Sequence, residues 1–278
     1  MKNILKIMLM MITIFTIAGS AVYAAEIPVS DQDQLITSSD WTEISNLQDE
    51  MKKEEPDATI DYDKALKVYV DCNLIKLQTA DTKKLTSALE SANYVWVIPF
   101  KMEKTYGMFT VAKGLPLREE AKSVLTKAEQ EEVKNHAGKW MITETAEHTV
   151  EPYYDILLEK REALSDCTRV VLVGSQPGMR QPVALGMDDE TARVWISLGY
   201  QYPVMEKIPE TQNVESGVYS FDSVAEISDT YIEDSEVSTG VGVQSRSSMK
   251  YVAGIGIIVI GSILILSVLK KKKLEDYE

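Results

Sequence analysis

Few residues of this 278-residue chain could perform covalent or acid–base chemistry. It holds two cysteines, Cys72 and Cys167, and two histidines, His136 and His148. A thiol nucleophile needs a histidine that meets it in space, and neither cysteine lies in a recognisable catalytic motif. A zinc site would need both histidines, which lie twelve residues apart in a spacing without metal specificity. The sequence therefore predicts no catalytic residue, no metal site and no cofactor.

Acid pairs are the remaining residues with catalytic potential. Asp61 with Asp63, or the run 188 to 190, could serve a glycosidase or hold calcium. The run 188 to 190 lies between two expected strands, however, where Asp-Asp is typical of a turn. An extracytoplasmic hydrolase with an unrecognised active site is the alternative to a binding protein.

The loop at 174 to 182 has the most individual sequence in the chain, Gly-Ser-Gln-Pro-Gly-Met-Arg-Gln-Pro. It combines turn-forming residues with a single cation that has no neighbouring acid, which favours a recognition role. Aromatic residues follow in the sequence Tyr-Gln-Tyr-Pro at 200 to 203. The predicted ligand-binding residues are Met179, Arg180, Tyr200 and Tyr202. Trp96, Trp140 and Trp195 are expected in the core.

The two cysteines have a second interpretation as a disulfide, because an exported chain meets oxidising conditions. Cys72 ends one expected strand and Cys167 precedes another, so neighbouring strands would allow a bond. The alternative is two buried thiols that pack as small apolar groups. The sequence leaves both open.

Hydrophobic periodicity indicates the elements that must position these residues. Residues 66 to 72 alternate as in a half-buried strand, and a strand at 94 to 98 is expected to stop at Pro99. Capping boxes are expected at Asp40 with Glu43 and at Thr126 with Glu129. Further helices are expected at 82 to 91, 117 to 136 and 153 to 165, and further strands at 108 to 112, 139 to 143, 168 to 174, 182 to 185 and 192 to 198.

These elements predict one α+β domain at 36 to 206, with a mainly antiparallel sheet and packed helices. The order helix, strand, turn, strand occurs at 82 to 112 and again at 153 to 185, which raises the hypothesis of a duplicated unit. Residues 25 to 35 are expected to form a flexible N-terminal segment.

The first 24 residues have the three parts of a secretory signal peptide. A charged start precedes the uncharged apolar residues 7 to 18, and small residues follow up to Ala25. Val22 and Ala24 fit an A-x-A-like cleavage site, so we expect cleavage after Ala24, with Ala25 as the neighbouring alternative. An uncleaved anchor is the other interpretation.

A second apolar segment spans 251 to 269, nineteen residues without a charge. As a helix it would be about 28 Å long, close to the ~30 Å hydrocarbon core of a bilayer. Four lysines follow at once, which places residues 270 to 278 in the cytoplasm as a short tail. The residues predicted to set the anchor and its orientation are Tyr251, Gly254, Gly261, Lys270, Lys271, Lys272 and Lys273.

This layout of signal peptide, ectodomain, apolar segment and basic tail resembles that of Gram-positive cell-surface proteins. Many of these are cut at an LPxTG-type motif and linked to the cell wall. No such motif precedes Tyr251, where residues 238 to 242 read Ser-Thr-Gly-Val-Gly. The resemblance implies a single-pass type I protein whose helix stays in the cell membrane.

The region between the two apolar segments is acidic. Six of the 29 basic residues and three of the 43 acidic ones lie outside 25 to 250, which leaves that region 23 basic and 40 acidic residues and a formal charge of −17. Nucleic acid and anionic lipid surfaces are poor partners for such a charge. Residues 207 to 250 are expected to form an acidic stalk or linker, although the apolar residues from Val218 to Ile227 could form a strand or dock on the domain.

The expected function is therefore that of a membrane-anchored surface protein. Its ectodomain would bind a partner or ligand, or serve as a subunit of an envelope complex, and its helix would contact the lipid bilayer through residues 251 to 269. The partner would be a membrane protein or another cell-surface molecule.

Overall fold

A computed structural model describes residues 27–148, 152–174, 176, 182–199 and 217–225 of the chain. The predicted signal peptide, membrane helix and cytoplasmic tail lie outside these residues. So do the predicted ligand-binding residues Met179, Arg180, Tyr200 and Tyr202. No helix in the described part of the chain has the length and apolar character needed to cross a membrane.

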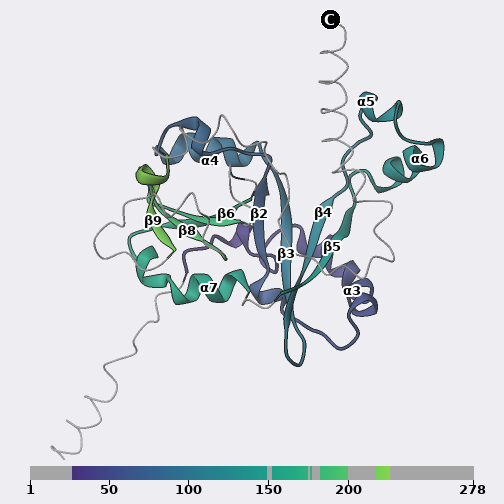
Figure 1. Ribbon diagram of the computed structural model, residues 1–278, viewed down its shortest axis with the longest axis horizontal. Helices are drawn as coiled ribbons and strands as arrows, with labels where there is room; N and C mark the ends of the chain where they lie inside the picture. Colours follow the sequence, from purple (N-terminus) through teal and green to yellow (C-terminus); the bar gives the residue numbers. More distant parts are fainter. Residues whose placement is uncertain (1–26, 149–151, 175, 177–181, 200–216, 226–278) are drawn as a thin grey trace, which may run out of the picture.

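Nine strands form one sheet, and short helices surround it (Figure 1). The strands are β1 Thr59–Ile60, β2 Leu66–Val70, β3 Asn93–Lys101, β4 Tyr106–Lys113, β5 Trp140–His148, β6 Arg169–Val173, β7 Val183–Met187, β8 Ala192–Ser197 and β9 Val218–Ser220. The α-helices are α2 Trp41–Ile44, α3 Gln48–Glu54, α4 Thr82–Glu90, α5 Glu119–Lys122, α6 Lys127–His136 and α7 Tyr153–Glu159. Short 3-10 helices are η1 Asp31–Asp33, η2 Ser45–Leu47, η3 Tyr62–Lys64, η4 Ile75–Leu77 and η5 Arg161–Leu164.

The sheet consists of two antiparallel meanders joined through their first strands. Its order is β5-β4-β3-β2-β6-β7-β8-β9, with β1 paired to β3. The first meander is β2 to β5 and the second is β6 to β9, and β2 pairs with β6 in parallel. Every other strand pair is antiparallel. The expected α+β fold with a mainly antiparallel sheet is therefore confirmed, with one parallel pairing at its centre.

That central seam is short, because β2 and β6 pair only at Val68 with Leu172 and at Tyr69 with Val173. Toward their N-terminal ends the two strands separate, and the N-terminal segment, residues 27 to 35, lies between them. Val29 bridges to Val170 of β6, and Gln34 bridges to Leu66 of β2. The N-terminal segment thus completes the sheet where the two meanders diverge.

This position differs from the flexible segment expected at 25 to 35. Ile27 and Val29 are buried against β6 and α7, and Leu35 is fully buried beneath α2 and α3. The Val170 N–H donates to the Pro28 carbonyl at 2.8 Å, and the Leu35 N–H donates to the Ala65 carbonyl at 3.2 Å. The segment is ordered because its polar backbone and its apolar side chains both find partners on the sheet.

Alternate residues of the central strands face opposite sides of the sheet. On one side, α4 covers the second meander through Leu85 and Leu89, packed on Val171, Val173 and Leu185. On the same side, α2 and α3 cover the first meander. On the opposite side, α7 packs against strands of both meanders. Figure 1 shows α4 and α7 on opposite sides of β6 and β8.

Most expected elements are present, with one instructive difference in β3. The strand continues through Pro99 to Lys101 instead of stopping there. The Pro99 carbonyl accepts a hydrogen bond from Asp61 N at 2.9 Å, on the side of β3 away from β4. On that side β2 ends its pairing at Leu66 with Val97, and only the two-residue strand β1 follows, so the missing N–H of proline interrupts no long strand pairing.

The domain also extends into the segment expected to be an acidic stalk. Val218–Ser220 forms β9, which pairs with β8, and the side chains of Phe221 and Val224 are buried. Phe221 packs beside Trp195, with ring centroids 6.1 Å apart. The docked alternative therefore describes residues 217 to 225, because the domain core offers these apolar side chains a site.

The sheet relates the two halves differently from the hypothesis of a duplicated unit. That hypothesis matched α4-β3-β4 with α7-β6-β7. In the sheet order, however, β2 and β6 are the equivalent first strands of the meanders, so β3 corresponds to β7.

Candidate functional site

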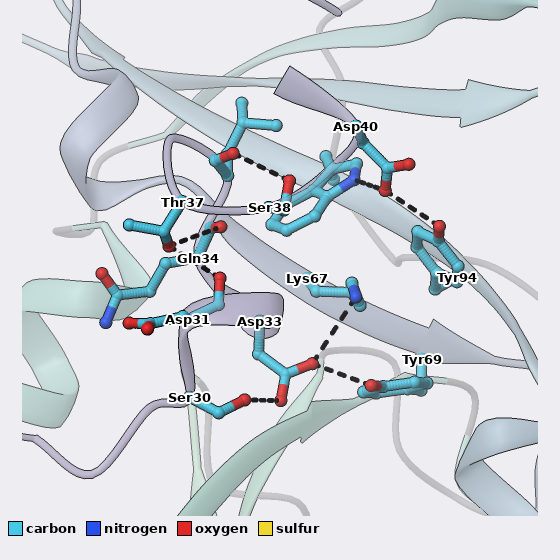
Figure 2. A network of polar contacts seen from close by, with 12 residues as sticks. Ser30, Asp31, Asp33, Gln34, Thr37, Ser38, Asp40, Lys67, Tyr69 and Tyr94 are labelled. Atoms are coloured by element: carbon cyan, nitrogen blue, oxygen red, sulfur yellow. Dashed lines mark hydrogen bonds and ion pairs between the residues drawn. The ribbon is translucent and has the colours of Figure 1, made fainter. Parts of the chain in front are cut away.

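A polar cluster lies on the central strands, between the hydrophobic core under α4 and the core under α2 and α3 (Figure 2). Its side chains come from four parts of the chain: the N-terminal segment and the turn after it, β2, β3 and β6. We call it the central polar cluster, and it consists of Ser30, Asp33, Asp40, Lys67, Tyr69, Tyr94, Trp96 and Arg169.

Asp33 is the most buried charge of the cluster, with 2 % of its side chain exposed. Its carboxylate accepts hydrogen bonds from the Ser30 hydroxyl at 2.6 Å, the Tyr69 hydroxyl at 2.8 Å and the Arg169 guanidinium at 3.0 Å. The Lys67 ammonium lies 3.7 Å away. One carboxylate of the N-terminal segment therefore contacts both strands of the parallel seam.

Asp40 holds the other side of the cluster. Its Oδ2 atom accepts from the Tyr94 hydroxyl at 2.8 Å and from the Trp96 indole Nε1 at 3.0 Å. The capping box expected at Asp40 and Glu43 is therefore wrong, because the Asp40 side chain caps no backbone N–H of α2. Two donors from β3, the buried Trp96 and the half-buried Tyr94, bind its carboxylate instead, since a polar group left without a partner in the interior is costly.

Lys67 lies among aromatic rings as well as carboxylates. Its Nζ atom is 4.6 Å from the ring centre of Tyr94, 5.2 Å from that of Trp96 and 5.8 Å from that of Tyr69. Burial lowers the pKa of Lys67, and the nearby carboxylate of Asp33 opposes that shift. The ring faces and the carboxylate together compensate the ammonium for lost water.

The two tyrosines of the cluster are held in their neutral form. Burial and the adjacent Asp33 carboxylate raise the pKa of Tyr69. Burial and the hydrogen bond to Asp40 raise the pKa of Tyr94. Both hydroxyls therefore stay donors at neutral pH, which is the state that the two carboxylates need.

The cluster is balanced within itself, with two carboxylates against one ammonium and one guanidinium. Its geometry fits the role of a clasp that fixes the N-terminal segment across β2 and β6. An amine of lowered pKa can act as a nucleophile, but here the Lys67 ammonium is occupied by Asp33 and three rings. The arrangement therefore favours attachment over catalysis.

Sequence reasoning missed this cluster because the alternating pattern of β2 predicts a half-buried strand. Lys67 and Tyr69 occupy the alternate positions that such a strand gives to solvent, yet the N-terminal segment covers that side. The available signal was the pairing of Lys67 with aromatic residues on the same strand and on β3, since aromatic side chains rarely gather on an open face.

The carboxyl ends of β2 and β6 lie side by side, where Tyr69 pairs with Val173. The buried side chain of Gln176 connects the segments that follow these two strands. Its amide accepts from Leu74 N at 3.2 Å and donates to the Cys72 carbonyl at 2.7 Å and the Gly174 carbonyl at 3.0 Å. Gln176 thus anchors the base of the loop that holds the predicted ligand-binding residues Met179 and Arg180, which lie outside the described residues.

Both cysteines are free thiols in the structure. Cys72 packs against the core under α4, and Cys167 belongs to the core on the α7 side. A disulfide between them is therefore not formed, because the sheet separates the two sulfur atoms. Burial raises the pKa of each thiol to about 11, which leaves both protonated and unreactive at neutral pH.

The other residues considered for chemistry have structural roles where they are described. The Asp188 carboxylate accepts from Glu190 N and Thr191 N, as expected for a turn. Trp96, Trp140 and Trp195 are buried, as expected for core residues. Within the described ranges no group of three or more potential ligands is placed to hold a metal ion.

Comparison with known proteins adds no relative to this picture. No protein-family model, curated protein or solved structure matches the chain. The class defined by the fold is an α+β domain with a mixed, mostly antiparallel nine-stranded sheet and a few helices.

Proposed function

We propose that the chain is a single-pass membrane protein of the cell surface, whose α+β domain lies outside the cytoplasm and binds a protein partner. The observation that carries this proposal is the pair of apolar segments that flank the domain, one ending in a cleavage-site pattern and the other in Lys270–Lys273. The domain would act as the outer subunit of an envelope complex.

The start of the domain supports a cleaved signal peptide. Ile27 is already buried, so only Ala25 and Glu26 separate the packed N-terminal segment from the expected cleavage site. An uncleaved membrane helix at residues 7 to 18 would leave only residues 19 to 26 to connect it to the packed segment.

The acidic charge and the anchored loop support recognition of another molecule. The region 25 to 250 carries a formal charge of −17, which favours a cationic partner surface. Gln176 fixes the base of the 174 to 182 loop. The proposed contact residues are Met179 and Arg180 of this loop, together with Tyr200 and Tyr202. A rigid scaffold that carries a distinctive loop is typical of binding sites.

A pull-down from the native membranes tests the proposal. The full-length protein in detergent is compared with residues 25 to 250 alone, and bound proteins are identified by mass spectrometry. A partner recovered by both forms places the contact in the domain, and one recovered only by the full-length form places it in the membrane segment. If neither form recovers a partner, the binding function is overturned.

A further inference from the structure

Strand β5 forms one end of the sheet, and none of the described residues pairs with its outer edge (Figure 1). The strand is long, Trp140–His148, whereas β9 at the opposite end has only three residues. An unpaired strand edge of this length presents a row of backbone donors and acceptors to any extended segment that approaches it.

The register shows which backbone groups point outward. Pro99 pairs with Met108 of β4, but its carbonyl bonds away from β4, to Asp61. Hydrogen-bonding groups alternate along an antiparallel strand, so those of Met108 turn toward β5, where its partner is Ala146.

The same alternation applies to β5 itself. Because the backbone groups of Ala146 turn inward to β4, those of Thr145 and Glu147 turn outward. These outward groups have no backbone partner among the described residues. A shift of register beside Thr110 places an extra residue in the strand, so the regular part of this edge is 144 to 148.

Four acidic side chains lie along this edge. Glu144 and Glu147 lie on β5, and Glu54 and Glu55 end α3 beside it; none of the four belongs to an ion pair in the described part of the chain. Burial and then the charges of Glu147 and Glu54 raise the pKa of Glu55, and burial raises that of Glu144. In the part of the chain that the structure describes, no cation offsets these shifts.

A second copy of the chain would fit this edge poorly. Self-pairing of β5 would bring the glutamates of two copies together, and like charges across a strand pair are destabilising. A segment with Lys or Arg at alternate positions would instead place cations on one face of the sheet, where Glu147 lies near Glu54 and Glu55.

We propose that the outer edge of β5 binds an extended, lysine- or arginine-bearing segment of another protein by strand addition. The inference rests on the proposed function and specifies the chemistry of its partner. Backbone hydrogen bonds at Thr145 and Glu147 would hold the segment, and the glutamates would select its basic side chains.

A peptide of nine residues that alternates lysine and valine is the probe, labelled for fluorescence anisotropy and titrated with the full-length protein in detergent. Glu147→Pro removes one outward N–H and one charge. The backbone of residue 147 makes no hydrogen bond to β4, so the pairing of β5 with β4 is retained. Glu147→Gln is the matched control that removes the charge alone. Thermal unfolding of each variant checks that it folds.

We expect the proline variant to bind about tenfold more weakly than the glutamine variant, since a hydrogen bond and strand continuity are lost. A peptide of the same sequence with N-methyl groups on one edge should lose binding to the unchanged protein, which tests the edge even if the proline variant fails to fold. Absence of peptide binding, or equal binding by both variants and both peptides, would overturn the proposal.

The native pull-down separates this inference from the proposed function. A partner recovered by the wild type but lost with Glu147→Pro supports both. If the wild type and Glu147→Pro recover the same partner, the edge of β5 is not its site. The strand-addition proposal then fails, while the binding function stands. If the wild type recovers none, the proposed function itself fails.

Discussion

The two meanders of the sheet reach stability by different means. The second, β6 to β9, is covered by α4, which belongs in sequence to the first meander because it connects β2 to β3. The first, β2 to β5, is covered by α2 and α3 and by the N-terminal segment, and its core is rich in aromatic rings. Each half therefore depends on chain that arrives from elsewhere.

The comparison shows where the molecule needs polar interactions. The cores under the helices are apolar, and the buried ion pairs are concentrated at the seam between the meanders. The seam has only two paired positions in parallel. A short backbone seam is thus reinforced by α4, by the N-terminal segment and by the central polar cluster, all of which cross it.

The largest loss of stability is expected when a buried side chain is removed beside the second meander. Phe221→Ala deletes a fully buried ring beside Trp195, and we expect a loss of about 3 to 5 kcal/mol in the free energy of unfolding. Urea denaturation measures it, with the exposed neighbour in Asp222→Ala as control. A loss no larger than that of the control would mean that residues 217 to 225 do not belong to the domain.

The next largest effect concerns the seam. Asp33→Asn leaves Lys67 and Arg169 without their shared carboxylate, and we expect a loss of about 3 kcal/mol, the lower end for a broken buried ion pair. Asp31→Asn, an exposed neighbour in η1, should change stability by less than about 0.5 kcal/mol. If the two variants denature alike, the N-terminal segment does not bind the meanders together through Asp33.

Asp40 tests the first meander alone. Asp40→Ala leaves the Tyr94 hydroxyl and the Trp96 indole N–H without their acceptor, and a loss of about 2 kcal/mol is expected. Tyr94→Phe, which removes one of the two donors, should recover part of that loss when it is combined with Asp40→Ala. A double-mutant cycle without coupling would refute the contact.

The two thiols, which lie on opposite sides of the sheet, predict a pH dependence of stability. Because the pKa of each thiol is about 11 in the folded protein and ~8.5 when unfolded, the folded state holds more protons between these values. Stability should therefore fall as pH rises from about 9 to 11. The slope should be smaller in the double variant Cys72→Ala, Cys167→Ala.

The same thiols allow a direct chemical check. Iodoacetamide added in denaturant without reductant should label both Cys72 and Cys167, and mass spectrometry would count two additions per chain. Zero additions before reduction would show a disulfide, and the two cysteines would then have to share one side of the sheet.

Local sequence signals predict much of the fold. The capping box at Thr126 and Glu129 is present as expected, because its two partners are three residues apart. The alternating pattern located β2, and the turn at Asp188 followed from its residue types. The errors occurred where distant chain intervened: at Asp40, whose carboxylate turned to β3, and in residues 27 to 35, which filled the gap between two strands.

The sequence by itself determined the helices and strands, the α+β class and the expected membrane topology, since each depends on periodicity, caps or charge within a short window. Only the tertiary structure decided the parallel seam, the opposite positions of Cys72 and Cys167 and the central polar cluster. Asp33 meets Tyr69 across 36 residues and Arg169 across 136. No local pattern encodes such a contact, because its stabilisation arises only when packing removes all of these groups from water together.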